Sequence, residues 1–158
     1  MQIAVIGSAI EDDPGILSMA HDLGAALAQK SHIIICGGMG GIMEAVSHGA
    51  HEADGTAVGV LPSNERHTGN RFLTAEVVTG LHEMRNAVVV ASGDIVIAFP
   101  GAFGTLSELA FAMKYDKPIV VVQPEHFYLD FTLIPYARLT FAWNLMDIIN
   151  SIEEYDDL

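Results

Sequence analysis

The chain has 158 residues, 51% of them hydrophobic, a composition that predicts a folded protein and argues against a disordered one. Its 20 acidic residues outnumber its 7 lysines and arginines, and the net charge of −13 argues against a nucleic-acid partner, which requires a basic surface. No apolar run reaches the roughly 18 residues of a membrane-spanning helix, so no membrane is expected, and the single Cys36 fits a reducing cytoplasm.

Apolar runs of strand length alternate with amphipathic stretches of helix length. In chain order we predict strand 2–7, helix 14–29, strand 32–36, helix 42–53, strand 56–61, loop 62–74, strand 75–78, helix 81–91, strand 94–99, helix 104–115, strand 118–122 and a last helix near 143–154. The aromatic residues between the last strand and the last helix make either a core patch or a dimer contact. Continuous Val/Ile runs that alternate with helices are typical of a parallel sheet with both faces covered. We therefore predict an α/β fold: one domain over residues 1–158 with a doubly wound, mostly parallel, Rossmann-like sheet and helices on both faces.

Two glycine-bearing turns each connect a predicted strand to a helix. The first is Gly37-Gly38-Met39-Gly40-Gly41 and the second runs from Pro100 to Thr105, with glycine at 101 and 104. Parallel sheets of this kind bind ligands at the carboxyl ends of their strands, where both turns should lie. Free amides at a helix start, together with the helix dipole, favour a phosphate there. Neither turn matches a common nucleotide fingerprint. Ordinary strand–helix turns are the alternative, although two such turns at one sheet edge favour a ligand.

Glu108, in the helix after the second turn, has two interpretations. Thr105 and Glu108 have the spacing of a capping box, in which Glu108 would reach back to the start of the helix, and the local sequence favours this interpretation. An acid beside a phosphate site is electrostatically unfavourable, however. The second interpretation is therefore that the Glu108 carboxylate acts on the substrate.

Three stretches, residues 37–62, 79–86 and 94–112, together resemble the LOG-like family, whose members have long been mislabelled as possible lysine decarboxylases. The family signature Pro-Gly-Gly-x-Gly-Thr-x-x-Glu is matched from Pro100 to Glu108, with Ala102 in place of its second glycine. Arg85 matches the upstream family arginine. Because Asn86 follows it, the chain most resembles a short branch that includes proteins similar to molybdenum-cofactor carriers.

The resemblance implies a function and a set of site residues. Family members of the cytokinin-activating type are phosphoribohydrolases, which release the base and ribose 5-phosphate from a nucleoside 5′-monophosphate. By position, Arg85 and Glu108 would be catalytic. The residues implied for binding the phosphorylated ligand are Gly7, Ser8, Gly37, Gly38, Gly40, Gly41, Pro100, Gly101, Gly104 and Thr105, with Met39 as a wall of the pocket. Family members are commonly homo-oligomers, so a homo-oligomer is expected.

The departures from the family pattern keep a second function open. The hydrolase branch prefers lysine where this chain has Asn86, and Ala102 makes the second turn less permissive. Both departures favour a carrier or sensor that binds a nucleotide or a molybdopterin-type cofactor without turnover. Retention of Arg85 and Glu108 favours the enzyme.

Pyridoxal-phosphate chemistry and metal binding are not expected. A lysine decarboxylase of that kind would need a Schiff-base lysine, and Lys30, Lys114 and Lys117 all lie at or near predicted helix ends, outside both glycine turns. No resident cofactor is therefore assigned. His48 and His51 lie one helical turn apart, but no third ligand is placed beside them, which favours a solvated helix face over a metal site.

Overall fold

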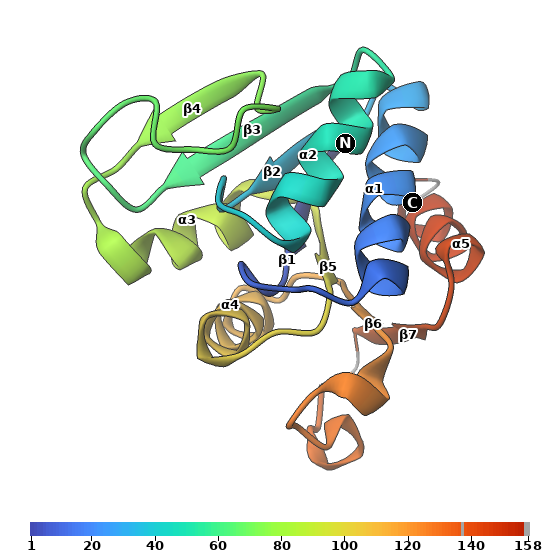
Figure 1. The fold of residues 1–158 in the computed structure, drawn as a ribbon. Coiled ribbons are helices and arrows are strands. Elements are labelled where there is room, and N and C mark those ends of the chain that lie inside the picture. Colours follow the sequence, from blue (N-terminus) through green and yellow to red (C-terminus); the bar gives the residue numbers. More distant parts are fainter. Residues whose placement is uncertain (137, 157–158) are drawn as a thin grey trace.

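The structure is a computed structural model that describes residues 1–136 and 138–156. These described residues form one parallel sheet of seven strands, in the order β4-β3-β2-β1-β5-β6-β7 (Figure 1). The strands are β1 (Gln2–Ile6), β2 (Ile33–Cys36), β3 (Thr56–Leu61), β4 (Ala75–Val78), β5 (Ile95–Ala98), β6 (Ile119–Val122) and β7 (Leu139–Ala142). The chain starts at β1, winds outward to β4, and then returns to the other side of β1 to place β5, β6 and β7.

In the described residues, five α-helices cover the two faces of this sheet. They are α1 (Pro14–Gln29), α2 (Ile42–Glu52), α3 (Arg85–Ser92), α4 (Phe103–Lys114) and α5 (Leu145–Asp156). The apolar sides of α1, α2 and α5 pack in one core cluster with residues of the sheet, and those of α3 and α4 pack in a second cluster against the opposite face. The predicted α/β fold is confirmed, including the doubly wound, parallel sheet with helices on both faces. Among the described residues, no helix combines the length and the hydropathy needed to cross a membrane.

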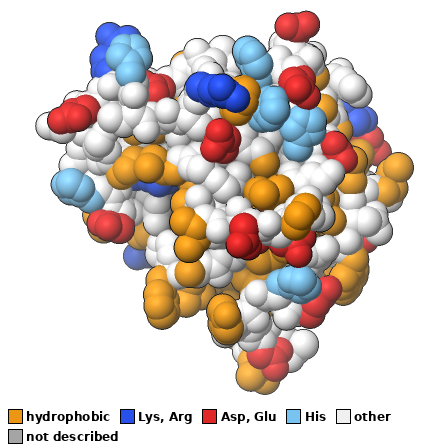
Figure 2. Space-filling model, viewed as in Figure 1, with side chains coloured by type: hydrophobic (Ala, Val, Ile, Leu, Met, Phe, Trp, Pro, Cys, Tyr) orange, Lys and Arg blue, Asp and Glu red, His pale blue; other side chains and the backbone are white. Residues whose placement is uncertain are grey.

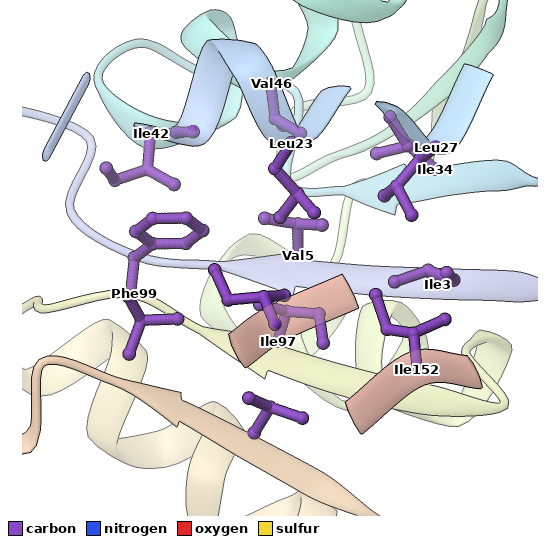
Figure 3. Close-up of a cluster of buried hydrophobic side chains, with 14 of the residues drawn as sticks. Ile3, Val5, Leu23, Leu27, Ile34, Ile42, Val46, Ile97, Phe99 and Ile152 are labelled. Atoms are coloured by element: carbon purple, nitrogen blue, oxygen red, sulfur yellow. The ribbon is translucent and has the colours of Figure 1, made fainter. Parts of the chain in front are cut away.

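The larger core cluster reaches the carboxyl edge of the sheet. Figure 3 shows side chains of β1 and β5, such as Val5 and Ile97, facing Leu23 of α1, and all three are fully buried. Full burial of such side chains stabilises the fold by about 1.5–3 kcal/mol each. At the end of the cluster, Ile42 lies over the ring of Phe99 (Figure 3). These two residues begin α2 and follow β5, so the core anchors the turns at that edge.

Most predicted bounds differ from the structure by a residue or two, one helix begins later than predicted, and one strand was missed. The helix predicted over 81–91 begins only at Arg85, because His82–Met84 form a 3-10 turn. The strand β7 is a short edge strand whose pairing with β6 supplies its conformation. In the aromatic segment before it, Phe131 is buried between Phe127 and Phe141, which confirms a core patch at that residue.

Candidate functional site

A hollow of about 380 Å³ lies at the carboxyl edge of the sheet, beside the point where the strand order reverses. Its walls come from the segment after β1 (residues 7–10), from Met39 and Met43, from Pro62, from residues 82–86 before and at the start of α3, and from residues 102–108. Open parallel sheets bind their ligands at this reversal point, because the connections on either side leave a crevice there.

Ser8 joins the two glycine turns. Its backbone N–H donates to the carbonyl oxygen of Pro100 at 3.1 Å, and its own carbonyl oxygen accepts from the N–H of Ile42 at 3.0 Å. Gly41 has a φ of +58°, and a Cβ there would collide with the Ser8 carbonyl oxygen. Glycine is therefore required for this approach. The two turns lie side by side, as the parallel sheet predicted.

The second turn leads into α4 without a capping box. The helix begins at Phe103 with Ala102 as its N-cap, and no side chain of the described residues accepts a hydrogen bond at this cap. Glu108 is thus the sixth residue of the helix and lies beyond its first turn, so the capping interpretation is wrong. The first amides of α4, including those of Gly104 and Thr105 on the wall of the hollow, have no intrahelical acceptor. Together with the helix dipole, they suit an anion.

Arg85 and Glu108 are buried polar residues on one wall of the hollow. Their exposed fractions are 9% and 6%, although charged side chains are rarely buried in proteins. The Arg85 guanidinium lies against Gly37, where a Cβ would collide with Nη1. The Nε of Arg85 is buried without a hydrogen-bond partner in the described part of the chain. A buried donor of this kind costs about 1–3 kcal/mol, which an acceptor on a ligand would offset.

Burial dominates the electrostatics of this pair. It raises the pKa of Glu108 to about 8, against the opposing effect of the Arg85 charge. Burial also lowers the pKa of Arg85, while Glu108 raises it, and a guanidinium stays charged at neutral pH in any case. The empty site at pH 7 therefore contains a cation and a carboxyl group that is largely protonated. Carboxyl groups perturbed in this way are common at functional sites.

Asn86 connects α3 to α4. Its Nδ2 donates to the Ser107 hydroxyl at 2.9 Å and lies 3.5 Å from the Gly104 carbonyl oxygen. The side chain that replaces the family lysine is therefore occupied in holding the first turn of α4.

The predicted site residues fall into two groups. The walls of the hollow include Gly7, Ser8, Met39, Arg85, Gly104, Thr105 and Glu108. The others are not among its lining residues: Gly37, Gly38, Gly40, Gly41, Pro100 and Gly101. Of these, Gly37 lies against Arg85, Gly41 against Ser8 and Gly101 against Thr105. Whether either group contacts a ligand stays a prediction.

Sequence reasoning did not assign several residues that line the hollow. They are Ala9, Ile10, Met43, Pro62, His82 and Glu83. Their types carry no binding signature by themselves. Two of them, His82 and Glu83, lie within the stretch 79–86 that already resembled the family, so proximity to Arg85 was the available signal.

Solved structures with this architecture include two molybdenum-cofactor proteins. The molybdenum cofactor binding protein of the phototrophic bacterium Rippkaea orientalis is 31% identical, with a TM-score of 0.85 over 97% of this chain and 94% of that chain. The molybdenum cofactor carrier protein of Chlamydomonas reinhardtii is 28% identical, with a TM-score of 0.86 over 99% of both chains.

Curated relatives include plant enzymes. A probable cytokinin riboside 5′-monophosphate phosphoribohydrolase of Oryza sativa subsp. japonica is 32% identical over 132 residues, which is 77% of this chain and 57% of the relative. The chain thus spans little more than half the length of this enzyme. The sequence profile of the SLOG cluster4 family matches residues 1–144. With that match over most of its length, and with the same fold as these proteins, the chain belongs to the SLOG cluster4 family.

Proposed function

We propose that the hollow binds a nucleoside 5′-monophosphate-like ligand and that Arg85 and Glu108 hydrolyse its N-glycosidic bond, releasing the base and ribose 5-phosphate. The proposal rests on one observation above all: the buried side chains of Arg85 and Glu108 lie at a single hollow, and each has hydrogen-bonding capacity that the described residues do not satisfy. Glu108 does not cap its helix, and Arg85 retains an unpartnered Nε.

The ligand phosphate would bind at the start of α4. The amides of Gly104 and Thr105 lie at the hollow, and the Thr105 hydroxyl is close enough to Gly101 that a Cβ there would collide with it. The turn is therefore closely packed beside these amides, and phosphate groups bind well at such helix starts. Binding the phosphate, remote from the bond that breaks, would position the sugar.

Hydrolysis breaks the bond between C1′ and the base nitrogen, and its electron pair leaves with the base. Positive charge then develops on the ribose ring, and an ionised Glu108 carboxylate near C1′ would stabilise that charge. A water molecule, oriented or deprotonated by the same carboxylate, adds to C1′, and its proton balances the charge on the departing base. Arg85 would hold the carboxylate ionised once a ligand is bound, or would bind the ribose or phosphate through its paired N–H groups.

Incubation with AMP, GMP, IMP and CMP, followed by chromatography of the released bases, tests this proposal. We expect base release by the wild-type protein and a reduction of about 100-fold or more in Glu108→Gln, since a lost transition-state interaction of this type costs 10²–10³ in rate. Circular dichroism of the variant controls for its fold. If the protein binds a nucleotide, releases no base, and is unchanged by Glu108→Gln, the proposed activity is wrong.

Transport or sensing of a cofactor without turnover is the second candidate function. It is favoured by the near-complete alignment with the two molybdenum-cofactor proteins, compared with 57% of the plant enzyme. It is also favoured by Asn86, a neutral side chain that donates to the Ser107 hydroxyl and so supplies no basic group to the site. Native mass spectrometry of the purified protein distinguishes the two functions. A co-purified pterin phosphate without base release would support the carrier.

A further inference from the structure

Two histidines and a glutamate meet on the surface of the paired helices α1 and α2. The Nε2 atom of His21 lies 2.9 Å from Oε2 of Glu52, and the Nε2 atom of His48 lies 3.2 Å from Oε1 of the same carboxylate. One ligand atom from each of the three residues lies within 4.8 Å of the others. Figure 2 shows pale-blue histidines gathered with acidic side chains over these helices, near the top of the view.

A close helix contact places these side chains on a rigid support. A Cβ on Gly49 would collide with the carbonyl oxygen of His21, and a Cβ on Gly24 would collide with that of Val46. Glycine inside a helix costs about 1 kcal/mol relative to alanine, so the close approach of the two backbones accounts for both glycines. The contact brings His21 of α1 within reach of His48 and Glu52 of α2.

Neighbouring groups orient both imidazole rings. Nδ1 of His21 lies 3.3 Å from a carboxylate oxygen of Asp22, an arrangement that leaves Nε2 to bind a metal. The ring of His48 stacks on Phe72 with a centroid distance of 4.0 Å and an interplanar angle of 14°. Both Nε2 atoms therefore face the Glu52 carboxylate in a defined orientation.

We infer that His21, His48 and Glu52 form a binding site for a divalent transition-metal ion of the zinc type. Two imidazole nitrogens and one carboxylate oxygen are ligands that Zn²⁺ accepts, at about 2.0–2.2 Å each. Tetrahedral bonds of that length separate the ligand atoms by about 3.3 Å. The two imidazole nitrogens lie 2.9 and 3.2 Å from the two oxygens of one carboxylate, and the three ligand atoms lie within 4.8 Å of one another, so rotations of these partly exposed side chains can bring them to this spacing. The side chains are 31%, 39% and 57% exposed, so water can occupy the remaining coordination position.

The surrounding charge favours a cation, and the site is separate from the hollow. Asp22 adds a negative charge beside the ligands, and the net charge of −13 attracts divalent cations to the surface. None of the three ligands lines the hollow, which contacts the other end of α2 at Met43. The proposed metal site thus does not depend on the proposed activity. The ligand group pairs His48 with His21 and Glu52, and His51 is not part of it.

Calorimetric titration of the tag-free, chelator-treated full chain with Zn²⁺ at neutral pH tests the site. We expect one equivalent bound per chain with micromolar or tighter affinity. His21→Ala and Glu52→Gln should each weaken binding by about tenfold or more, and Asp22→Asn by a smaller factor. His51→Gln is the matched control and should change the affinity by less than about twofold, because His51 is outside the ligand group. Co²⁺ serves as a second probe, and its visible absorption should report nitrogen and oxygen ligands only when His21 and Glu52 are intact.

Three results would overturn the inference. The first is the absence of saturable Zn²⁺ binding by the wild-type chain. The second is equal affinity in the wild type, His21→Ala and Glu52→Gln. The third is a loss in His51→Gln as large as that in His21→Ala, which would assign the metal to surface histidines of α2. Circular dichroism confirms the fold of each variant, and all of the substituted side chains are partly exposed.

Discussion

At the scale of single residues, the site depends on Arg85 and Glu108, whose pKa values are shifted by burial. Glu108 was open to two interpretations in the sequence, and the structure removes one of them because α4 starts two residues before Thr105. The sequence alone does not show that Arg85 and Glu108 are buried, because charged residues are usually exposed. The raised pKa of Glu108 follows from the packing of α3 against α4 around the hollow. The sequence pattern could therefore identify Glu108 as a candidate site residue, but its raised pKa could be inferred only from the fold.

The buried carboxyl makes stability depend on pH. The unfolded chain ionises Glu108 near its usual pKa of 4.5, whereas the folded chain holds the proton up to about 8. The unfolded state thus binds fewer protons in this window, so the Glu108 contribution to stability falls as the pH rises from 4.5 to 8. The penalty is about 1.4 kcal/mol for each pH unit of the window. We expect Glu108→Gln to be more stable than the wild type at pH 8 and to lose this advantage near pH 4.5. Urea unfolding at both pH values measures the difference. An advantage that does not change with pH contradicts this linkage.

The same group should set the pH dependence of base release. The proposed mechanism needs the carboxylate, which forms as the pH rises through about 8. Below that pH, kcat/KM for a nucleoside monophosphate should fall roughly tenfold per pH unit. Initial rates of base release from pH 6 to 9 measure this profile, with uncatalysed release as the control. Faster release at lower pH would assign Glu108 the role of a general acid.

Gly37 offers a way to displace Arg85 without unfolding the chain. A methyl group at this position would collide with the guanidinium of Arg85 and with Sδ of Met43, both at the ends of flexible side chains that can move. We expect Gly37→Ala to reduce base release by about 100-fold and to change the free energy of unfolding by less than about 1 kcal/mol. Kinetics and urea unfolding of the same preparation measure both quantities. Gly15→Ala, remote from the hollow, is the control. Unchanged activity would show that the position of the guanidinium is unimportant.

At the scale of elements, the sequence predicted the alternation of strands and helices better than the contacts between them. The Val/Ile runs of β5 and β6 are fully buried, and such runs need no partner to be recognised. The edge strand β7 is only partly buried and depends on β6 for its conformation, so its pattern is weak. The two glycine turns were predictable as a pair. Their shared contact with Ser8 was not, because it depends on how β1 and β5 are paired.

From the contact between α1 and α2 we predict how Gly49→Ala changes the stability of the chain. Alanine is the better helix former by about 1 kcal/mol, but a Cβ at this position meets the backbone of His21, which cannot move without separating the helices. The collision should outweigh the gain, so we expect Gly49→Ala to lower the free energy of unfolding by about 1–3 kcal/mol. Urea unfolding measures this change. The matched control is Gly104→Ala in α4, where a Cβ meets no atom within 4 Å and stability should not fall. A more stable Gly49→Ala would show that the helices can separate freely.

At the scale of the whole molecule, the doubly wound connection gathers the site. Residues near positions 8, 40, 85 and 105 are far apart in the chain and come together because β1 lies between β2 and β5. The parallel fold was therefore enough to predict that both turns share one edge. The identity of the remaining wall residues required the observed order of strands.

The outermost strands, β4 and β7, have only four residues each. Such short edge strands offer few unpaired backbone groups to an incoming strand, which disfavours the edge-to-edge pairing that causes aggregation. Copies of this chain are thus poorly suited to joining edge to edge. If the expected homo-oligomer forms, its subunits should meet through helices or loops, where Phe103 is largely exposed and Tyr128 is fully exposed to solvent.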